Sequence, residues 1–309
     1  MDAPRGPVVV PLDGSAHAER ALPLSLRLAR GLGERLHLVY TLGPATGHSY
    51  GAIRQALSYV EGLGRQVSNL GIGCETTVVA DDPVAALLDL VDESGASLIS
   101  LASPEPGRSP FWRLGTLADR LVERAPVPVL IHTPLAPDQA DHDLAAAGPI
   151  VVALDGSPSA EAVLPEAARL ARGLGRGVSL VYADEARAYG GVRRPRPARA
   201  VEAADGDAAS LHGLAAWVRG HGIAALGGSA SGEFVHLIRD RVEREDAVMV
   251  AMTARGHAGL GQFRVSPTAT AVLQAAPVPV LLLGPAALAR VAAPALPEPH
   301  LVPLLATAS

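Results

Sequence analysis

The chain contains the same sequence pattern twice, and this repeat constrains its fold more than any other feature. Asp13-Gly14-Ser15 recurs as Asp155-Gly156-Ser157, and Leu-Ala-Arg-Gly-Leu-Gly at 28–33 recurs at 170–175, both at a separation of 142 residues. Ala-Pro-Val-Pro-Val-Leu at 125–130 recurs at 276–281, a separation of 151 residues. The second copy is therefore longer than the first by about nine residues, the difference between 151 and 142. Units of this length are complete domains rather than solenoid repeats.

Each copy alternates apolar runs with helical patterns. The run at 8–12 is continuously apolar, as expected of a strand that is buried on both faces. We expect strands at 8–12, 35–40, 76–79, 98–101 and 127–132, and helices at 19–32, 51–70 and 84–93. Strands separated by helices imply right-handed crossovers and a parallel sheet. The predicted fold class is α/β, with two tandem domains that are each a five-stranded parallel open sheet with helices on both faces.

The predicted domains are residues 1–134 and 148–285. A linker rich in Ala, Pro and Asp at 135–147 separates them, and a proline-rich tail occupies 286–309. We expect little regular structure after Gly284, because five prolines follow it.

Composition excludes several classes of protein. The net charge of −5 and the aromatic content of 3% argue against a nucleic-acid binder. Cys74 is the only cysteine, so no disulfide can form within the chain and a reducing compartment is expected. The N-terminus has no signal-peptide pattern, and no apolar run approaches 18 residues, so we predict no membrane span and a cytoplasmic location.

The two Asp-Gly-Ser sequences are the first candidate site. In open α/β sheets, ligands bind beyond the carboxyl ends of the strands. Asp13 and Asp155 end the first strand of their copies, where a carboxylate can accept hydrogen bonds from an adenine or a ribose. The alternative is an Asx turn in which the aspartate caps the next helix and the glycine supplies an unusual backbone angle. From the residues alone, both interpretations stay open.

The motifs PLDGSAHAERAL, LHLVY, APVPVLIH and APVPVLLLG resemble the universal stress protein family in its tandem two-domain form. The resemblance covers nearly the whole chain outside the linker and tail. It implies a Rossmann-like, adenine-nucleotide alpha-hydrolase-like fold that is usually paired through its last strand. Here the two copies would pair within one chain as a pseudo-dimer, and two chains could assemble further as a homodimer.

ATP-binding members of this family resemble one another in a loop after the fourth strand. It reads Gly, two residues, Gly, nine residues, then Gly-Ser or Gly-Thr. Glycines let backbone N–H groups approach phosphate oxygens at a helix N-terminus. In the first copy Gly115 and Thr116 match, but Ala102 and Glu105 replace the two leading glycines. The carboxylate of Glu105 would repel a phosphate, so we expect this copy to have lost the triphosphate site.

The second copy keeps a different part of the loop. Gly256 matches, Thr253 replaces the first glycine, and Ser266-Pro267 stands in place of Gly-Ser. Ser266 as N-cap with Pro267 at the first helical position is a good helix start, but the proline removes a donor from a phosphate cradle. The resemblance implies the following candidate nucleotide-binding residues: Asp155, Ala183, Met252, Thr253, Gly256, Gly259 and Ser266 in the second copy, and Asp13, Thr41, Gly115 and Thr116 in the first.

Other motifs add little to this interpretation. The histidines show no metal-ligand spacing, and Walker A, Gly-x-Ser-x-Gly and dinucleotide fingerprints are absent from the sequence, so we predict no metal site and no enzyme activity. The segment 187–199 is rich in arginine, and we interpret it as a solvated loop. The predicted function is that of a regulatory binding protein that acts on an unidentified protein partner and has degenerate ATP loops with little or no ATP binding. The alternative is a sensor that binds ATP or AMP, with Mg, mainly in the second domain.

Overall fold

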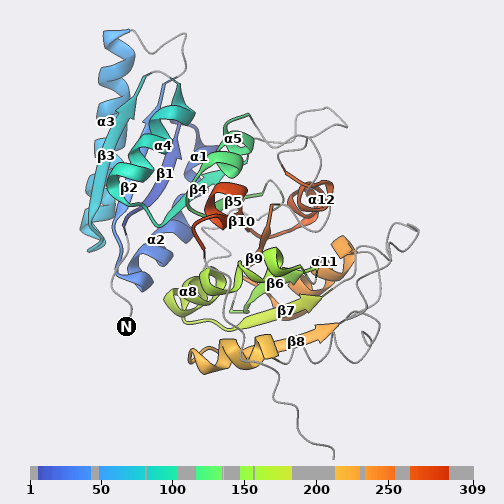
Figure 1. Ribbon diagram of the computed structural model, residues 1–309. Coiled ribbons are helices and arrows are strands. Elements are labelled where there is room, and N and C mark those ends of the chain that lie inside the picture. The colour runs from blue at the N-terminus through green and yellow to red at the C-terminus, as the bar shows by residue number, and fades with distance from the viewer. Residues whose placement is uncertain are drawn as a thin grey trace, which may run out of the picture.

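The computed structural model describes residues 6–42, 49–80, 82–103, 116–133, 135, 147–155, 157–182, 213–229, 234–254 and 265–291. The first copy contributes the strands β1 (Val8–Leu12), β2 (Leu36–Thr41), β3 (Cys74–Val79), β4 (Leu98–Ala102) and β5 (Val129–His132). The second copy contributes β6 (Ile150–Leu154), β7 (Val178–Tyr182), β8 (Ala225–Ser229), β9 (Met249–Thr253) and β10 (Val280–Leu283). These strands form one continuous ten-stranded sheet in the order β3-β2-β1-β4-β5-β10-β9-β6-β7-β8 (Figure 1).

Each half of the sheet is parallel, as the alternation of strands and helices predicts. β1 pairs with β2 and β4, and β6 pairs in the same way with β7 and β9. The halves meet where β10 lies antiparallel to β5, with Leu281 opposite Leu130. The last strands of the two copies therefore join two five-stranded sheets into one, and the carboxyl ends of the two sets of strands point in opposite directions.

The helices of the first copy are α1 (Ala16–Glu19), α2 (Leu22–Leu32), α3 (Tyr50–Asn69), α4 (Pro83–Ser94) and α5 (Thr116–Arg124). The described helices of the second copy are α7 (Pro158–Glu161), α8 (Leu164–Leu174), α11 (Phe234–Glu245), α12 (Pro267–Ala275) and α13 (Pro285–Leu288). They cover both faces of the sheet, because α2, α3 and α8 pack into one apolar core and α4, α5, α11 and α12 into another. None of the described helices is long and apolar enough to cross a bilayer.

The structure corrects two expectations from the sequence. The helix predicted over 19–32 begins only at Leu22, as α2, and a separate short helix that was not predicted, α1, ends at Glu19. Pro23 explains the break, since its ring would clash with the carbonyl four residues earlier, at Glu19. Pro165 stands in the same relation to Glu161 between α7 and α8. The chain after Gly284 is also more regular than expected, because α13 begins there with Pro285 at its first position.

The two copies also pack against each other through α2 and α8, and glycines allow a close approach there. A Cβ atom on Gly31 would lie 1.7 Å from the carbonyl oxygen of Gly173. Gly31 and Gly173 occupy matching positions of the repeat. The close contact of the two helices therefore depends on the absence of a side chain at this point.

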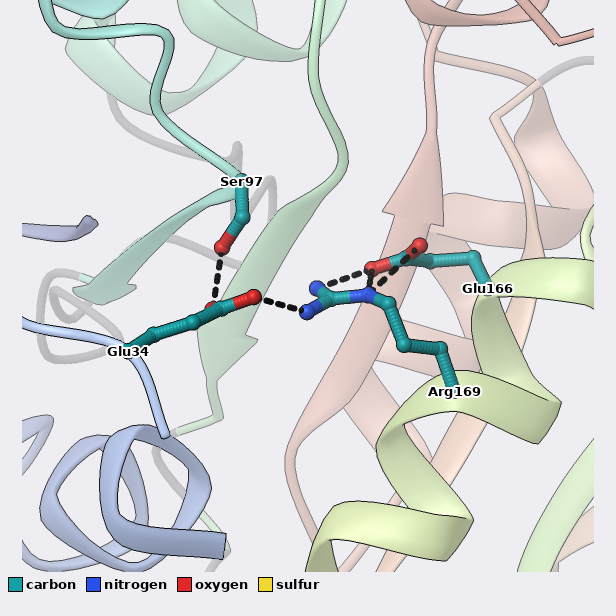
Figure 2. Close-up of polar contacts among 4 residues, drawn as sticks. All are labelled: Glu34, Ser97, Glu166 and Arg169. Carbon is teal, nitrogen blue, oxygen red and sulfur yellow. Dashed lines mark hydrogen bonds and ion pairs between the residues drawn. The ribbon is translucent and has the colours of Figure 1, made fainter. Parts of the chain in front are cut away.

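Beside this contact lies a buried ion network that joins the copies (Figure 2). Arg169 on α8 donates from its NH1 group to Glu34 Oε1 of the first copy at 2.7 Å, and from its NH2 group to Glu166 Oε1 at 2.6 Å. Ser97 Oγ donates to the other oxygen of Glu34 at 2.6 Å. Burial by itself would lower the pKa of Arg169, but Glu166 and Glu34 raise it, so the guanidinium stays charged.

The contact between α2 and α8, together with this network, is called the joint between the two copies. The network occurs on one side of the joint only. The repeat places Arg176 at the position of Glu34, and Arg27 at the position of Arg169. Two arginines therefore stand where the symmetry of the repeat would require the same ion pair again. The two halves of the joint have consequently diverged in charge, although they share a backbone.

Candidate functional site

The Asp13 sequence forms a tight turn at the carboxyl end of β1. Asp13 Oδ1 accepts from the backbone N–H of Ser15 at 2.9 Å and from its hydroxyl at 2.6 Å. Ser15 is the N-cap of α1 and accepts from the N–H of Ala18 at 3.1 Å. Gly14 has a φ of +83°, a backbone angle that favours glycine. The aspartate thus holds the turn that starts the next helix.

Asp155 repeats this arrangement at the carboxyl end of β6. Its Oδ1 accepts from the N–H of Ser157 at 2.9 Å and from the Ser157 hydroxyl at 2.6 Å. Ser157 caps α7 by accepting from the N–H of Ala160 at 3.0 Å. The expected turn is therefore present in both copies, but the serine and not the aspartate caps the helix. One carboxylate oxygen of each aspartate serves the turn itself.

Side chains of β2 and α3 hold the Asp13 turn from its flank. Tyr40 donates its hydroxyl to the carbonyl oxygen of Asp13 at 2.9 Å, and a Cβ atom on Gly14 would lie 2.8 Å from that hydroxyl. The Tyr40 ring meets the ring of Tyr59 edge to face at a centroid distance of 5.5 Å. Thr41 Oγ1 donates to the carbonyl oxygen of Leu12 at 3.2 Å. The candidate residues Asp13 and Thr41 are thus close together at the end of the sheet.

The helix start that follows the second loop is the most informative part of the site. Ser266 is the N-cap of α12, Pro267 opens the helix, and Ser266 Oγ accepts from the N–H of Ala269 at 3.1 Å, which confirms the predicted helix start. The N–H of Ser266 donates to the carbonyl oxygen of Ala254 at 2.8 Å. Pro267 has no N–H. Of the described N–H groups from Ser266 to Ala269, only that of Thr268 is left for an anion.

Met252 and Thr253, the other described candidates of the second copy, lie at the end of β9. Met252 is 6% exposed and Thr253 is 4% exposed. Thr116 begins α5, which agrees with a helix start at this position. The candidates Ala183, Gly115, Gly256 and Gly259, with the arginine-rich segment 187–199, lie outside the described residues.

The first copy contains a buried chain of polar side chains that was not predicted from the sequence. Ser25 Oγ donates to Ser100 Oγ at 2.8 Å, and Ser100 Oγ lies 3.0 Å from Nε2 of His132. His132 ends β5 and is 2% exposed, and burial lowers its pKa to about 3. His132 is therefore neutral at neutral pH. The only signal in the sequence is the polar residue that closes an apolar run.

The second copy replaces this chain by apolar residues. The repeat places Ala167, Ala251 and Leu283 at the positions of Ser25, Ser100 and His132. His17 of α1 is also specific to the first copy, and its Nε2 contacts the carbonyl oxygen of Ser103 at the end of β4. The two copies thus have the same backbone at the carboxyl ends of their strands. The side chains compared above are polar in the first copy and, at the three buried positions, apolar in the second. Among the described residues, no group of His, Cys, Asp and Glu could hold a metal ion.

The fold and the paired turns define a class of protein: two α/β units that each end their first strand in an Asp-Gly-Ser turn. The sequence model of the Universal stress protein family matches residues 4–132 and 147–284. The chain belongs to the universal stress protein family, with two such domains in tandem, as the sequence motifs predict.

Solved structures show the same fold over almost the whole chain. A universal stress protein from Archaeoglobus fulgidus DSM 4304 has a TM-score of 0.65 at 18% identity, covering 90% of this chain and 97% of its own. A functionally unknown protein from Pseudomonas aeruginosa PAO1 has a TM-score of 0.60 at 16% identity, covering 93% and 95%. A comparison with curated proteins finds no significant match. At these identities the likeness concerns the fold.

Proposed function

We propose that this member of the universal stress protein family is a regulatory binding protein with little or no affinity for ATP. It acts by binding a protein partner rather than by catalysis. The observation that carries the proposal is the start of α12, where Ser266 and Pro267 stand in place of the Gly-Ser of ATP-binding relatives. A phosphate cradle needs several convergent N–H donors, and most of those donors are engaged or missing here.

The hydrogen bonds at this helix start support the proposal. The N–H of Ser266 donates to Ala254, and the N–H of Ala269 donates to the Ser266 hydroxyl. A phosphate bound through these two N–H groups would have to replace both bonds, and of the described N–H groups here only that of Thr268 could bind it without such competition. Since a typical hydrogen bond contributes on the order of 1 kcal/mol net, the two existing bonds oppose binding through these groups by about 2 kcal/mol.

The first copy supports the same proposal by a different route. Its sequence has Ala102 and Glu105 in place of the two glycines that lead the loop. Asp13 holds its own turn through Ser15. The loop carboxylate lowers the affinity for a triphosphate by charge repulsion, and the turn leaves only one oxygen of Asp13 to accept from a ligand.

The test is to release small molecules from the full chain after native purification and identify them by mass spectrometry. The proposal predicts no stoichiometric adenine nucleotide. Co-purified ATP or AMP would support the alternative of a nucleotide sensor. Loss of that nucleotide in Asp155→Ala but not in Asp13→Ala would assign it to the second domain. Phosphate release from Mg-ATP that depends on either aspartate would contradict the proposal of a non-catalytic protein.

A further inference from the structure

The first copy ends the sheet in an open edge. β3 is the last strand on that side, and its register with β2 is unbroken over Cys74–Val79. At the start of this ladder Leu36 donates its N–H to the carbonyl oxygen of Gly73 at 2.9 Å. Alternate residues of β3 therefore face β2, and the N–H and C=O groups of Thr76 and Val78 point away from it. No hydrogen bond within the described part of the chain reaches these groups.

Nothing in β3 itself blocks the pairing of another strand. Natural edge strands are usually protected by lysine, proline, a bulge or a covering segment. β3 contains no proline, lysine or arginine, its register has no bulge, and none of its residues is fully buried. The opposite edge, β8, is different. Gly227 and Gly228 weaken it as a strand, and the carbonyl oxygen of Ala225 accepts from Arg219 NH1 at 3.0 Å.

The helix beside the β3 edge carries exposed apolar side chains. Gly64 of α3 packs on β3, because a Cβ atom there would lie 2.8 Å from Thr76 Cγ2 and 3.7 Å from Cys74 Sγ. Leu57 lies seven residues before Gly64 and Tyr50 seven before Leu57, so the three share one stripe of the helix. The side chains of Leu57 and Tyr50 are 39% and 77% exposed.

This stripe lies on the side of the open edge and not on the side of the middle of the sheet. On the other flank of α3, Tyr59 donates to Glu19 of α1 at 2.6 Å, and its ring meets that of Tyr40 on β2. Leu57 is two residues from Tyr59 and therefore lies about 200° away around the helix. Figure 1 shows α3 and β3 together at the end of the molecule opposite to β8. The outward backbone groups of Thr76 and Val78 and the side chains of Leu57 and Tyr50 are called the β3–α3 rim.

A second copy of the chain is the partner that this rim fits. The contact inside one chain already shows the mode of association, because β5 pairs antiparallel with the matching strand β10 while α2 packs beside the matching helix α8. The β3–α3 rim offers the same two parts, an edge strand and a helix beside it. β5 and β10 are used inside the chain, so a second chain has to use another edge.

The rim is also self-complementary, as a two-fold interface requires. With a two-fold axis at Thr76, the outward N–H and C=O groups of Thr76 form both hydrogen bonds with Thr76 of the other copy. Glu75 then lies opposite Thr77 of the other copy, so like charges do not meet. Glu61 and Arg65, an exposed pair on α3 with a separation of 3.9 Å, supply a polar border.

The size of the rim is sufficient for a weak dimer. α3 has 20 residues and is therefore about 30 Å long. One layer of helix and one of sheet, each about 10 Å thick, give roughly 600 Å² per copy and about 1,200 Å² in total. This area is at the lower end for a specific interface, so we expect dissociation at micromolar concentrations.

We propose that two copies of the chain associate through the β3–α3 rim, with β3 antiparallel to β3 of the other copy and α3 beside α3 on the same face. The two ten-stranded sheets are then continuous. The contact uses none of the candidate nucleotide-binding residues, so its failure leaves the proposed function untouched.

The experiment is sedimentation velocity of the full chain from about 1 to about 200 µM, a range that brackets the expected dissociation constant. Leu57→Arg places like charges on both sides of a symmetric contact. Thr76→Pro removes an N–H that points away from β2 and leaves the ladder with β2 intact. Leu135→Arg is the matched control, because Leu135 is 56% exposed and follows β5 in the middle of the sheet. Far-UV circular dichroism checks that each variant is folded, and Leu57→Arg decides the test if Thr76→Pro is not.

We expect the wild type to change from monomer to dimer over this range. Leu57→Arg and Thr76→Pro should weaken association about tenfold or more, and Leu135→Arg should stay within about twofold of the wild type. The amides of Thr76 and Val78 should become protected from hydrogen exchange as the concentration of the wild type rises, because they gain acceptors in the dimer.

Three results would overturn the proposal. The first is a wild type that stays monomeric at about 200 µM, which would leave the edge to a strand of another protein. The second is a dimer without added protection of Thr76 and Val78, which would place the contact elsewhere. The third is a dimer that Leu135→Arg dissociates as much as Leu57→Arg does.

Discussion

Removing the carboxylate of Glu34 tests the joint between the two copies. In Glu34→Ala, Arg169 loses its 2.7 Å hydrogen bond to Glu34, and Ser97 loses the acceptor of its hydroxyl. Arg169 keeps Glu166, which contacts both its Nε and its NH2 group. The side chains of Glu34 and Arg169 are 2% and 8% exposed, so water does not replace the lost partner.

The magnitude follows from this burial. Breaking a buried ion pair by removing one partner costs about 3–5 kcal/mol, and the remaining contact with Glu166 places Glu34→Ala near the lower end, at about 3 kcal/mol. Glu61→Ala is the control, because an exposed pair contributes less than about 1 kcal/mol. Replacing the whole network, with Glu34→Met, Glu166→Leu and Arg169→Met together, should restore most of the stability, since no charge is then left buried and unpaired.

The assay is urea unfolding of the full chain followed by far-UV circular dichroism, with midpoints compared at equal slopes. The wild type and Glu61→Ala should unfold together, Glu34→Ala well before them, and the triple variant close to the wild type. A cost for Glu34→Ala below about 0.5 kcal/mol would show that the network does not stabilise the joint. A triple variant less stable than Glu34→Ala would refute the claim that the unpaired charge is the source of the cost.

Three further predictions concern other parts of the fold. Burial lowers the pKa of His132 to about 3, so below pH 6.5 the unfolded chain binds a proton that the folded chain does not, and stability falls as the pH drops. Between pH 7 and pH 5 this histidine should lower the free energy of unfolding of the wild type by about 2 kcal/mol. Urea midpoints at the two pH values should show that Ser100→Ala/His132→Leu lacks this loss, and the same pH dependence in both proteins would argue against a buried neutral His132. Gly31→Val places a side chain against a carbonyl oxygen of α8 and should cost about 2–3 kcal/mol in thermal unfolding. Gly62→Ala on α3, where a Cβ atom would lie 3.9 Å from Arg65 NH2 in ordinary van der Waals contact, should be neutral or stabilising; equal effects would contradict the close contact. Ser266→Ala removes the cap of α12 and should cost about 1 kcal/mol in urea unfolding, most of which Ser266→Asp should restore; a failure of Asp to rescue would speak against capping.

The sequence predicts the strands and most helices because their signals are local. The apolar run at 8–12 predicts a strand, and the glycines after the first long helix predict where that helix ends. Neither signal depends on the rest of the chain. Pro23 was the missed signal, since its effect on the carbonyl of Glu19 separates α2 from the short helix α1, which was not predicted. The pairing of β5 with β10 was expected only through the family resemblance, because nothing in either strand specifies an antiparallel neighbour.

The polar features behind the sheet could not be predicted, because their partners are distant in the sequence. Glu34 follows the glycine that ends α2 and has the appearance of an ordinary surface charge, yet its partner Arg169 comes from the other copy. His132 ends an apolar strand, and its contact with Ser100 depends on the pairing of β4 with β5. At the candidate site, the cap at Ser266 was predictable from Ser-Pro alone. Its bond to Ala254 was not, because the two residues are separated in the sequence and no local pattern pairs them.

The central claim is that this chain has little or no affinity for ATP, and titration calorimetry with Mg-ATP tests it most directly. The full wild-type chain should give no saturable heat. The double variant Ser266→Gly/Pro267→Ser restores a backbone donor and the Gly-Ser of ATP-binding relatives, and it serves as the comparison. Saturable heat with the wild type that Asp155→Ala abolishes would contradict the claim and establish the second domain as a nucleotide sensor.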